Sequence, residues 1–246
     1  MIQKPRRGNE VEEQEHLRAL GELAAGVAHD LNNALHAMKL RLELLERDTE
    51  FATRHRSHLD ALVRVISDAN TRLRHLQDFA RQRPEHLCEQ VQLADIIQES
   101  VEIARSDIEH RAACLGVSVR IETEVPLLPR VHGLATDLRY VFINLLLNAR
   151  DAMPHGGTIL LRGTQAGSRV IVTVEDEGTG IPKAHLRSIF RPFFTTKGSQ
   201  GTGLGLSMAY GVMARLGGSI TAANRPEGGA VFTLTFPLPS RKLRSR

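Results

Sequence analysis

Three polar residues near the start of the chain have the types and the spacing that chemistry needs. Asp30 directly follows His29, and Asn33 lies one helical turn further along the same face of an expected helix. A neighbouring carboxylate can accept the imidazole Nδ1–H, fix the tautomer and leave Nε2 as a nucleophile. A histidine on a helix surface is more often simply solvated, so this group needs a reaction partner elsewhere in the chain.

A second polar group lies in a leucine-rich helix. Asn144 and Asn148 are four residues apart and share one face, whereas the three leucines between them mark the buried side of the helix. Neutral oxygen ligands suit Mg²⁺, which keeps waters and substrate phosphates in its coordination shell. Two asparagines on a helix can also be ordinary solvated surface, but here they would line the wall of a groove.

Three further stretches complete this pattern. Asp176, Gly178 and Gly180 follow an apolar strand, so the carboxylate could accept a hydrogen bond from the amino group of a flat base. The stretch from Phe190 to Lys197 combines aromatic residues with a cation suited to phosphate. The glycine-rich stretch 201–206 leads into an expected helix, and the free N–H groups at the start of that helix favour phosphate oxygens. Each motif is weak alone, but four of them in this order indicate a nucleotide site.

The first polar group must be positioned by a helical hairpin. From about residue 10 to 47 there is no proline and apolar residues recur every three and four positions, which predicts one long helix. The polar segment 48–54 is expected to turn, and a second periodic helix follows until Pro84. Because such a hairpin leaves wide apolar faces, we predict a four-helix bundle of two chains, a homodimer; packing on the chain's own second domain is the alternative. The predicted seam of the first helix contains Leu17, Leu20, Ala24, Val27, Leu31, Ala34 and Met38.

The nucleotide groups require a different architecture. Beyond a linker at 82–85, expected helices alternate with strands, and the last four strands form hairpins, which argues for a mixed sheet with helices on one face. The expected fold is therefore a long antiparallel helical hairpin followed by a two-layer α/β sandwich. We assign 1–86 to the N-terminal tail and hairpin, 87–240 to the α/β domain and 241–246 to a basic tail. Helices are expected at 94–113, 134–153 and 204–216, and strands at 91–93, 117–122, 158–163, 169–175, 219–223 and 230–236.

Composition narrows the class of protein. The chain has 246 residues, 41% of them apolar, which is enough for packed cores. Its net charge of +4 comes from four basic residues after position 240, and this does not suggest a nucleic-acid-binding surface. Cys88 and Cys114 are too few for a disulfide framework, and no apolar run reaches the roughly 18–20 residues of a membrane span. We therefore expect a cytoplasmic protein with reduced thiols, no transmembrane segment and no nucleic-acid partner.

Together, these motifs resemble the catalytic core of a bacterial two-component sensor histidine kinase. In that family a dimerisation and phosphoacceptor hairpin precedes an ATP-binding domain of the Bergerat (GHKL) type. The resemblance extends from about Leu17 to Pro237. The segment around His29 is similar to the H-box of the family, and residues 190–197 are similar to its F-box. Residues 144–152 resemble the N-box, and residues 176–180 and 201–205 resemble the glycine boxes.

The resemblance implies a role for each group. His29 would be the phosphoacceptor, ATP and Mg²⁺ would be the cofactors, and Asn148 and Asn144 would hold the metal. Asp176 would recognise adenine, with Thr233 of the final strand supporting it. The residues implied in ATP binding are Asn144, Asn148, Asp151, Asp176, Gly178, Gly180, Lys197, Gly201, Thr202, Gly203, Leu204, Gly205 and Thr233.

Three positions depart from common patterns of related proteins. ATPases of the same fold usually carry a water-activating glutamate where this chain has Asn144, so transfer to a side chain is favoured over hydrolysis. Ala34 stands where many histidine kinases have proline, and Asn32 stands where many have arginine. At Ala34 and Asn32 the chain resembles the nitrogen-regulator branch of the family.

We expect Nε2 of His29 to attack the γ-phosphorus of bound ATP in line, assisted by Asp30, while Lys197 and the glycine-loop amides neutralise charge. The phosphoryl group would pass to an aspartate in the receiver domain of a response regulator, a separate chain, and Asn33 could position water to dephosphorylate that regulator. An upstream sensor, either another protein or a domain preceding Met1, would supply the signal. The alternatives are a GHKL-type ATPase or serine kinase, and a dimeric nucleotide-binding scaffold without histidine phosphorylation.

Overall fold

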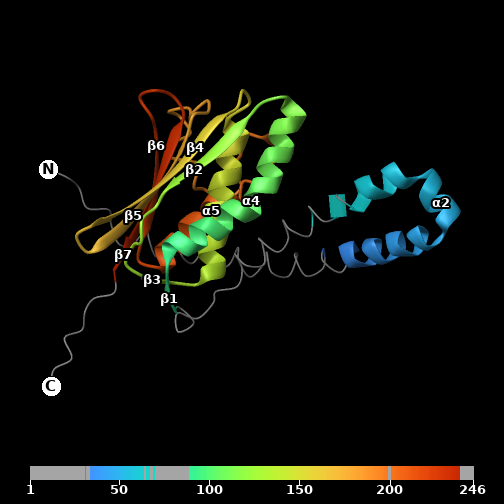
Figure 1. Cartoon of the computed structure of the whole chain (residues 1–246), viewed down its shortest axis with the longest axis horizontal. Helices are drawn as coiled ribbons and strands as arrows, with labels where there is room; N and C mark the ends of the chain where they lie inside the picture. The colour runs from blue at the N-terminus through green and yellow to red at the C-terminus, as the bar shows by residue number, and fades with distance from the viewer. Residues whose placement is uncertain are drawn as a thin grey trace, which may run out of the picture. The chain divides into compact units, whose positions relative to one another are not determined.

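The computed structural model describes residues 31, 34–63, 65–66, 69, 89–198 and 201–238. The chain forms two compact units, Met1–Pro84 and Glu85–Arg246 (Figure 1). His29, Asp30 and Asn33 lie outside the described residues, as do the predicted linker and the basic tail. The first polar group of the sequence therefore stays a prediction.

The segment between the two helices of the hairpin is itself helical. α2, Thr49–Arg54, begins after Asp48, whose Oδ1 accepts the N–H of Phe51 at 3.1 Å. Glu50 in the first turn and Arg54 in the last suit the helix dipole, and they form an ion pair at 3.0 Å. The prediction of a turn here is wrong, because the polar residues that suggested a break serve as a helix cap and an ion pair.

The flanking helical segments, 34–47 and 56–63, meet through a small apolar cluster. The predicted seam of the first helix is not the stripe that faces this cluster, since Leu31 and Met38 are 46% and 54% exposed. The hairpin therefore has two apolar stripes, one used inside it and one that the described residues leave uncovered. The cluster consists of Leu42, Ala52, Leu59 and Ile66, with Leu35 packed against it.

The second unit begins with a two-stranded sheet. β1, Glu89–Val91, pairs antiparallel with β3, Val131–Gly133. The strand predicted at 91–93 is thus shifted, because Leu93 is already the first residue of the next helix. β3 is absent from the sequence prediction, since three residues carry too little alternation to be recognised.

A five-stranded mixed sheet forms one layer of this unit. The strand order is β2-β4-β5-β7-β6, with β2 parallel to β4 and every other pair antiparallel. This confirms the predicted mixed sheet, and each of its strands lies within three residues of its predicted bounds. The strands are β2 (Val119–Glu124), β4 (Gly157–Ala166), β5 (Arg169–Asp176), β6 (Ser219–Asn224) and β7 (Ala230–Pro237).

Helices cover one face of this sheet and form the second layer. Figure 1 shows α4 and α5 side by side on the same side of the sheet. Along β5, alternate residues from Val170 to Val174 are buried in the core, whereas Ile171 and Thr173 between them are only half-buried. This confirms the predicted two-layer α/β sandwich. The helices are α4 (Leu93–Leu115), α5 (Ala135–Ala152) and α6 (Gly205–Arg215), and none of the described helices is long and apolar enough to cross a membrane.

Candidate nucleotide-binding site

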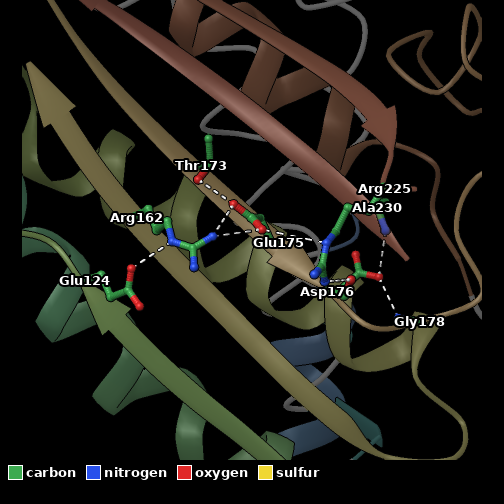
Figure 2. Close-up of polar contacts among 8 residues, drawn as sticks. All are labelled: Glu124, Arg162, Thr173, Glu175, Asp176, Gly178, Arg225 and Ala230. Carbon is green, nitrogen blue, oxygen red and sulfur yellow. Dashed lines mark hydrogen bonds and ion pairs between the residues drawn. The ribbon is translucent and has the colours of Figure 1, made fainter. Parts of the chain in front are cut away.

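Asp176 is the last residue of β5, and only 2% of its surface is exposed. Its Oδ1 accepts two backbone N–H groups, from Gly178 at 2.9 Å and from Ala230 at 3.1 Å (Figure 2). The second carboxylate oxygen, Oδ2, receives no hydrogen bond from the described residues. A buried carboxylate with one available oxygen is suited to a planar group that donates an N–H.

The environment of Asp176 disfavours its charge. Burial raises the pKa of this carboxyl group above its usual value. The hydrogen bonds from Gly178 and Ala230 and the positive charge of Arg225 act in the opposite direction without cancelling the shift. A perturbed carboxyl group at the end of a strand, next to a glycine loop, is typical of a functional site.

Two glycines allow the main chain to close around Asp176. Gly178 lies so near the end of α5 that an added Cβ would be 2.5 Å from the carbonyl oxygen of Ala152. Gly229, in the hairpin between β6 and β7, has a φ of +84°, and an added Cβ there would overlap the carbonyl oxygen of Asp176. The aspartate loop is therefore held between α5 and this hairpin.

Two residues at the end of β6 also hold this loop and are absent from the sequence-based site. Asn224 exchanges two hydrogen bonds of 2.7 Å with the main chain of Ile181, next to Gly180. Arg225 Nη1 donates a hydrogen bond to the carbonyl oxygen of Asp176 at 2.9 Å. The sequence does show two polar residues shortly before a Gly-Gly hairpin. Their contact with the Asp176 loop, however, could be inferred only from the register in which β5, β7 and β6 pair.

The structure does not bring Thr233 to Asp176, so the predicted support is corrected. Thr233 lies opposite Thr173 in the β5–β7 pair, and both occupy the face of the sheet that the helices do not cover. Asp176 has the opposite parity along β5 and shares the buried face with Val174. The final strand supports Asp176 through the backbone N–H of Ala230 instead.

On the polar side of α5, Asn148 and Asp151 hold the ammonium group of Lys197. Lys197 Nζ lies 3.1 Å from Asn148 Oδ1 and 2.5 Å from Asp151 Oδ2, and Arg150 pairs with the other oxygen of Asp151 at 2.6 Å. Burial works to raise the pKa of Asp151, but the hydrogen bonds and charges of Lys197 and Arg150 outweigh it and lower the pKa. The amide oxygen of Asn148 therefore faces a position that accepts a cation.

Asn144, one turn before Asn148, lies against the start of α6. An added Cβ at Gly205 would overlap the Asn144 side-chain oxygen, so glycine is needed where the two helices meet. The Nδ2 of Asn144 is buried and has no hydrogen-bond partner among the described residues. Such a donor costs stability until an acceptor such as a phosphate oxygen or a water satisfies it.

The segment from Phe190 to Lys197 packs on the second glycine loop. An added Cβ at Gly203, whose φ is +65°, would overlap the main chain of Phe193. An added Cβ at Gly201 would overlap the hydroxyl of Thr195. The F-box-like segment and the glycine loop are therefore one packed unit, and this unit carries Lys197 to α5.

The glycine loop leads directly into α6. The N–H of Leu204 is 3.4 Å from the hydroxyl oxygen of Thr202, and Gly205 is the first residue of the helix. The N-cap residue Leu204 offers no side-chain hydrogen bond to the first turn of α6. The N–H groups of this turn and the helix dipole favour a negatively charged group such as a phosphate.

The predicted groups thus converge on α5. Lys197 contacts Asn148, Gly205 lies against Asn144, and Gly178 lies against the helix end at Ala152. The site offers an acceptor for a base amino group, the Asn148 amide oxygen beside a cation position, and N–H donors at a helix start. This set of donors and acceptors fits a nucleoside triphosphate with a divalent cation.

Two family models match consecutive parts of the chain. Residues 19–85 match the His Kinase A (phospho-acceptor) domain. Residues 133–240 match the histidine kinase-, DNA gyrase B-, and HSP90-like ATPase family. The first match contains His29, and the second contains Asn144, Asn148, Asp176 and Lys197.

Similar proteins of known function are longer than this chain. Sporulation kinase A of Bacillus subtilis (strain 168) is 34% identical over 223 residues, which are 91% of this chain and 35% of that kinase. Sensor histidine kinase ZraS of Escherichia coli (strain K12) is 34% identical over 238 residues, which are 94% of this chain and 48% of ZraS. The chain therefore spans about a third to a half of the length of these relatives.

Solved structures of histidine kinases share the fold. The nucleotide-free catalytic domain of histidine kinase ThkA is 33% identical, with a TM-score of 0.52 over 61% of this chain and 95% of that domain. Full-length ShkA in complex with AMPPNP is 23% identical and has a TM-score of 0.65 over 88% of this chain. The chain belongs to the two-component sensor histidine kinases and contains the phosphoacceptor and ATP-binding domains of that family. The nitrogen-regulator branch stays a prediction.

Proposed function

We propose that this chain is a kinase core that uses ATP to phosphorylate its own His29. One observation carries the proposal: a phosphoacceptor match that contains His29 is joined, in the same chain, to a site in which Asp176, Asn148 and Lys197 can bind a nucleotide. With ATP as the donor, we expect the reaction to take place in the cytoplasm.

In this proposal Asp176 recognises the adenine. Its Oδ2 accepts a hydrogen bond from the 6-amino group, while Oδ1 keeps its bonds to Gly178 and Ala230. A purine with a 6-oxo group would bring an acceptor against the carboxylate and leave both without an N–H. The site is therefore selective for adenine nucleotides.

The other groups of the site bind the phosphates. Asn148 and Asn144 would hold Mg²⁺, and the contact of the Lys197 ammonium group with Asn148 Oδ1 supports a cation position there. When bound, Mg²⁺ neutralises part of the charge on the phosphate oxygens. Lys197 exchanges its contact with Asn148 for a phosphate oxygen, and the first N–H groups of α6 bind another.

The proposed chemistry is an in-line displacement at phosphorus. Nε2 of His29 forms a bond to the γ-phosphorus while the bond to the β–γ bridging oxygen breaks, and ADP leaves with that oxygen. Nε2 carries no proton when the ring is the Nδ1–H tautomer, so the attack needs no base. Asp30 accepts the Nδ1–H and stabilises the positive charge that develops on the ring.

The phosphoryl group then passes to an aspartate in the receiver domain of a response regulator, a separate chain, and Asn33 positions water for the dephosphorylation of that regulator.

We further propose that the hairpin forms a homodimer. Its uncovered apolar stripe supports this, because a second hairpin would bury that stripe in a four-helix bundle. Leu31, Met38 and Leu45, at seven-residue intervals on the first helix, and Leu62 and Val65 on the second are among the exposed apolar side chains.

Other reactions of the same fold are less well supported. Asn144 stands where related ATPases have a glutamate, and a neutral amide cannot take a proton from water. A serine kinase would give an acid-stable phosphoserine, and a nucleotide-binding scaffold would give no phosphoprotein. The chemical stability of the product therefore separates these functions.

Labelling with γ-³²P-labelled ATP and Mg²⁺ tests the proposal. Wild-type protein should take up label that acid removes and alkali preserves, and His29→Gln should take up none. His36→Gln is the matched control, because His36 is an exposed histidine seven residues further along the chain. Label on His29→Gln equal to that on the wild type, or label that survives acid, would contradict the proposal.

A further inference from the structure

A chain of charged side chains crosses the uncovered face of the sheet and ends at the main chain of Asp176 (Figure 2). Glu124 of β2 pairs with Arg162 of β4 at 2.8 Å, and Arg162 pairs with Glu175 of β5 at 3.2 Å. Glu175 lies 3.7 Å from the Nε of Arg225. Arg225 in turn donates from Nη1 to the carbonyl oxygen of Asp176 at 2.9 Å.

Glu175 lies beside Arg225 and forms an ion pair with it. The carboxylate of Glu175 is only 15% exposed, and it also accepts a hydrogen bond from the hydroxyl of Thr173 at 3.2 Å. The side chain of Arg225 is 23% exposed. A planar guanidinium held at one edge by a carboxylate presents its other N–H groups in a fixed direction. Arg225 is therefore oriented by its hydrogen bond to the Asp176 carbonyl group together with the neighbouring carboxylate of Glu175.

The bond from Arg225 acts on the backbone that carries the base-recognising carboxylate. Glu175 and Asp176 are neighbours on β5 and point to opposite faces, so Arg225 reaches the carbonyl group from the uncovered face while the Asp176 side chain lies on the other. Gly229 closes on the same carbonyl oxygen. Fixing this peptide group fixes where the Asp176 carboxylate points.

We propose that Arg225, oriented by Glu175, is a positioning residue for base recognition by Asp176. This inference rests on the proposed function, in which Asp176 Oδ2 accepts the 6-amino group of adenine. Arg225 does not touch the nucleotide. It holds the end of β5 so that Oδ2 meets the amino group, and its positive charge favours the ionised carboxylate, which is the stronger acceptor.

Binding of two purine nucleotides tests this role. ATP carries a 6-amino group, whereas inosine triphosphate carries an oxygen at C6 and a hydrogen on N1, with the same ribose and triphosphate. Isothermal titration calorimetry with each nucleotide gives the ratio of their affinities for the full chain. Arg225→Met should lower the affinity for ATP by about tenfold and change the affinity for inosine triphosphate little, so that the ratio falls by about tenfold.

Three further variants separate positioning from a general loss of structure. Arg225→Lys keeps the charge but not the planar fork, and Glu175→Gln keeps the shape but not the ion pair, so both should give intermediate ratios. Arg120→Met, at an exposed arginine of the edge strand β2, is the matched control and should keep the wild-type ratio. If Arg225→Met fails to fold in thermal unfolding, the Lys and Gln variants decide.

The outcomes distinguish the inference from the function on which it rests. A wild type that binds both nucleotides equally contradicts the adenine role of Asp176, and the inference fails with it. A wild type that prefers ATP, together with Arg225 and Glu175 variants that keep the full preference, contradicts only the positioning role. Equal weakening of both nucleotides by Arg225→Met would also contradict it, because a purely structural role affects both.

Discussion

Asp176 combines almost complete burial with a negative charge, and these two properties oppose each other. Its hydrogen bonds from Gly178 and Ala230 and the charge of Arg225 offset only part of the desolvation, since the pKa stays raised. A carboxyl group with a higher pKa in the folded state contributes stability below its unfolded pKa and loses it as the pH rises through the folded value. At neutral pH the ionised side chain therefore lowers the stability of the domain.

Asp176→Asn should remove this pH-dependent loss. The Asn oxygen can still accept both N–H groups, but no charge is buried. We expect the unfolding free energy from urea titrations to match or exceed that of the wild type near pH 7, and the difference in favour of the variant to grow as the pH rises above the ordinary pKa of an aspartate. ATP affinity should fall by about tenfold or more. A variant clearly less stable than the wild type near pH 7 would show that the charge stabilises the fold.

Asn33 is predicted to act on water and not on ATP. Its amide lies one turn from His29 on the same predicted helix face, where it can orient a water toward a phosphorylated aspartate. Asn33→Ala should slow dephosphorylation of the regulator by about tenfold or more and leave autophosphorylation within about twofold. Phosphate release and label uptake, followed in parallel, check this. Equal loss of both activities would refute the role.

At the scale of elements, the hairpin between β6 and β7 is the part that closes the base end of the site. Gly228 and Gly229 both have positive φ, +103° and +84°, so alanine is strained at either position. Only Gly229 also lacks space, because its Cβ would overlap the carbonyl oxygen of Asp176, whereas nothing lies within 4 Å at Gly228. Comparing alanine variants at the two positions therefore separates the effect of backbone strain from the effect of steric overlap with Asp176.

Gly229→Ala should lower ATP affinity by about tenfold or more, and Gly228→Ala should stay within about threefold of the wild type. The physical reason is that only the first change pushes the hairpin away from the end of β5. Calorimetric titration of both variants under the same conditions checks this. Similar losses in the two variants would attribute the effect to backbone strain alone.

The sequence predicts regular elements where their periodicity is long enough. Each strand of the main sheet has six or more residues, which is enough to give a recognisable pattern, and was found within three residues of its predicted bounds. The three-residue strand β3 has no such signal. The segment 48–54 was misjudged, because a cap residue such as Asp48 reads as a helix break until its hydrogen bond to Phe51 is known.

The site was predictable where one local motif carries the chemistry. Asp176 was identified because it ends a strand and precedes two glycines. Arg225 was not, because its contact is with a carbonyl group 49 residues earlier and depends on strand register. Thr233 was misplaced for the same reason: its face of the sheet follows from its pairing with Thr173, which the sequence does not display. The sequence likewise does not show which of the two apolar stripes of the hairpin packs inside it, because both have helical spacing and only the position of the second helix distinguishes them.

At the scale of the whole molecule, the two units have very different cores. The α/β unit packs three helices on one sheet, whereas the described part of the hairpin buries a small cluster around Leu42 and Leu59. Its second stripe, with Leu31 and Met38, has no cover among the described residues. Dimerisation, as proposed, would bury this second stripe in a four-helix bundle. The face of the first helix that carries His29 would stay exposed to solvent.

The central claim is that the γ-phosphate of ATP goes to a histidine of this chain and not to water. A single-turnover reaction with labelled ATP, Mg²⁺ and excess protein measures how the label divides between protein and orthophosphate. The account predicts that acid-labile phosphoprotein forms first, maps to the peptide containing His29, and is absent from His29→Gln. Orthophosphate that appears without any phosphoprotein, or at the same rate in His29→Gln, would contradict it.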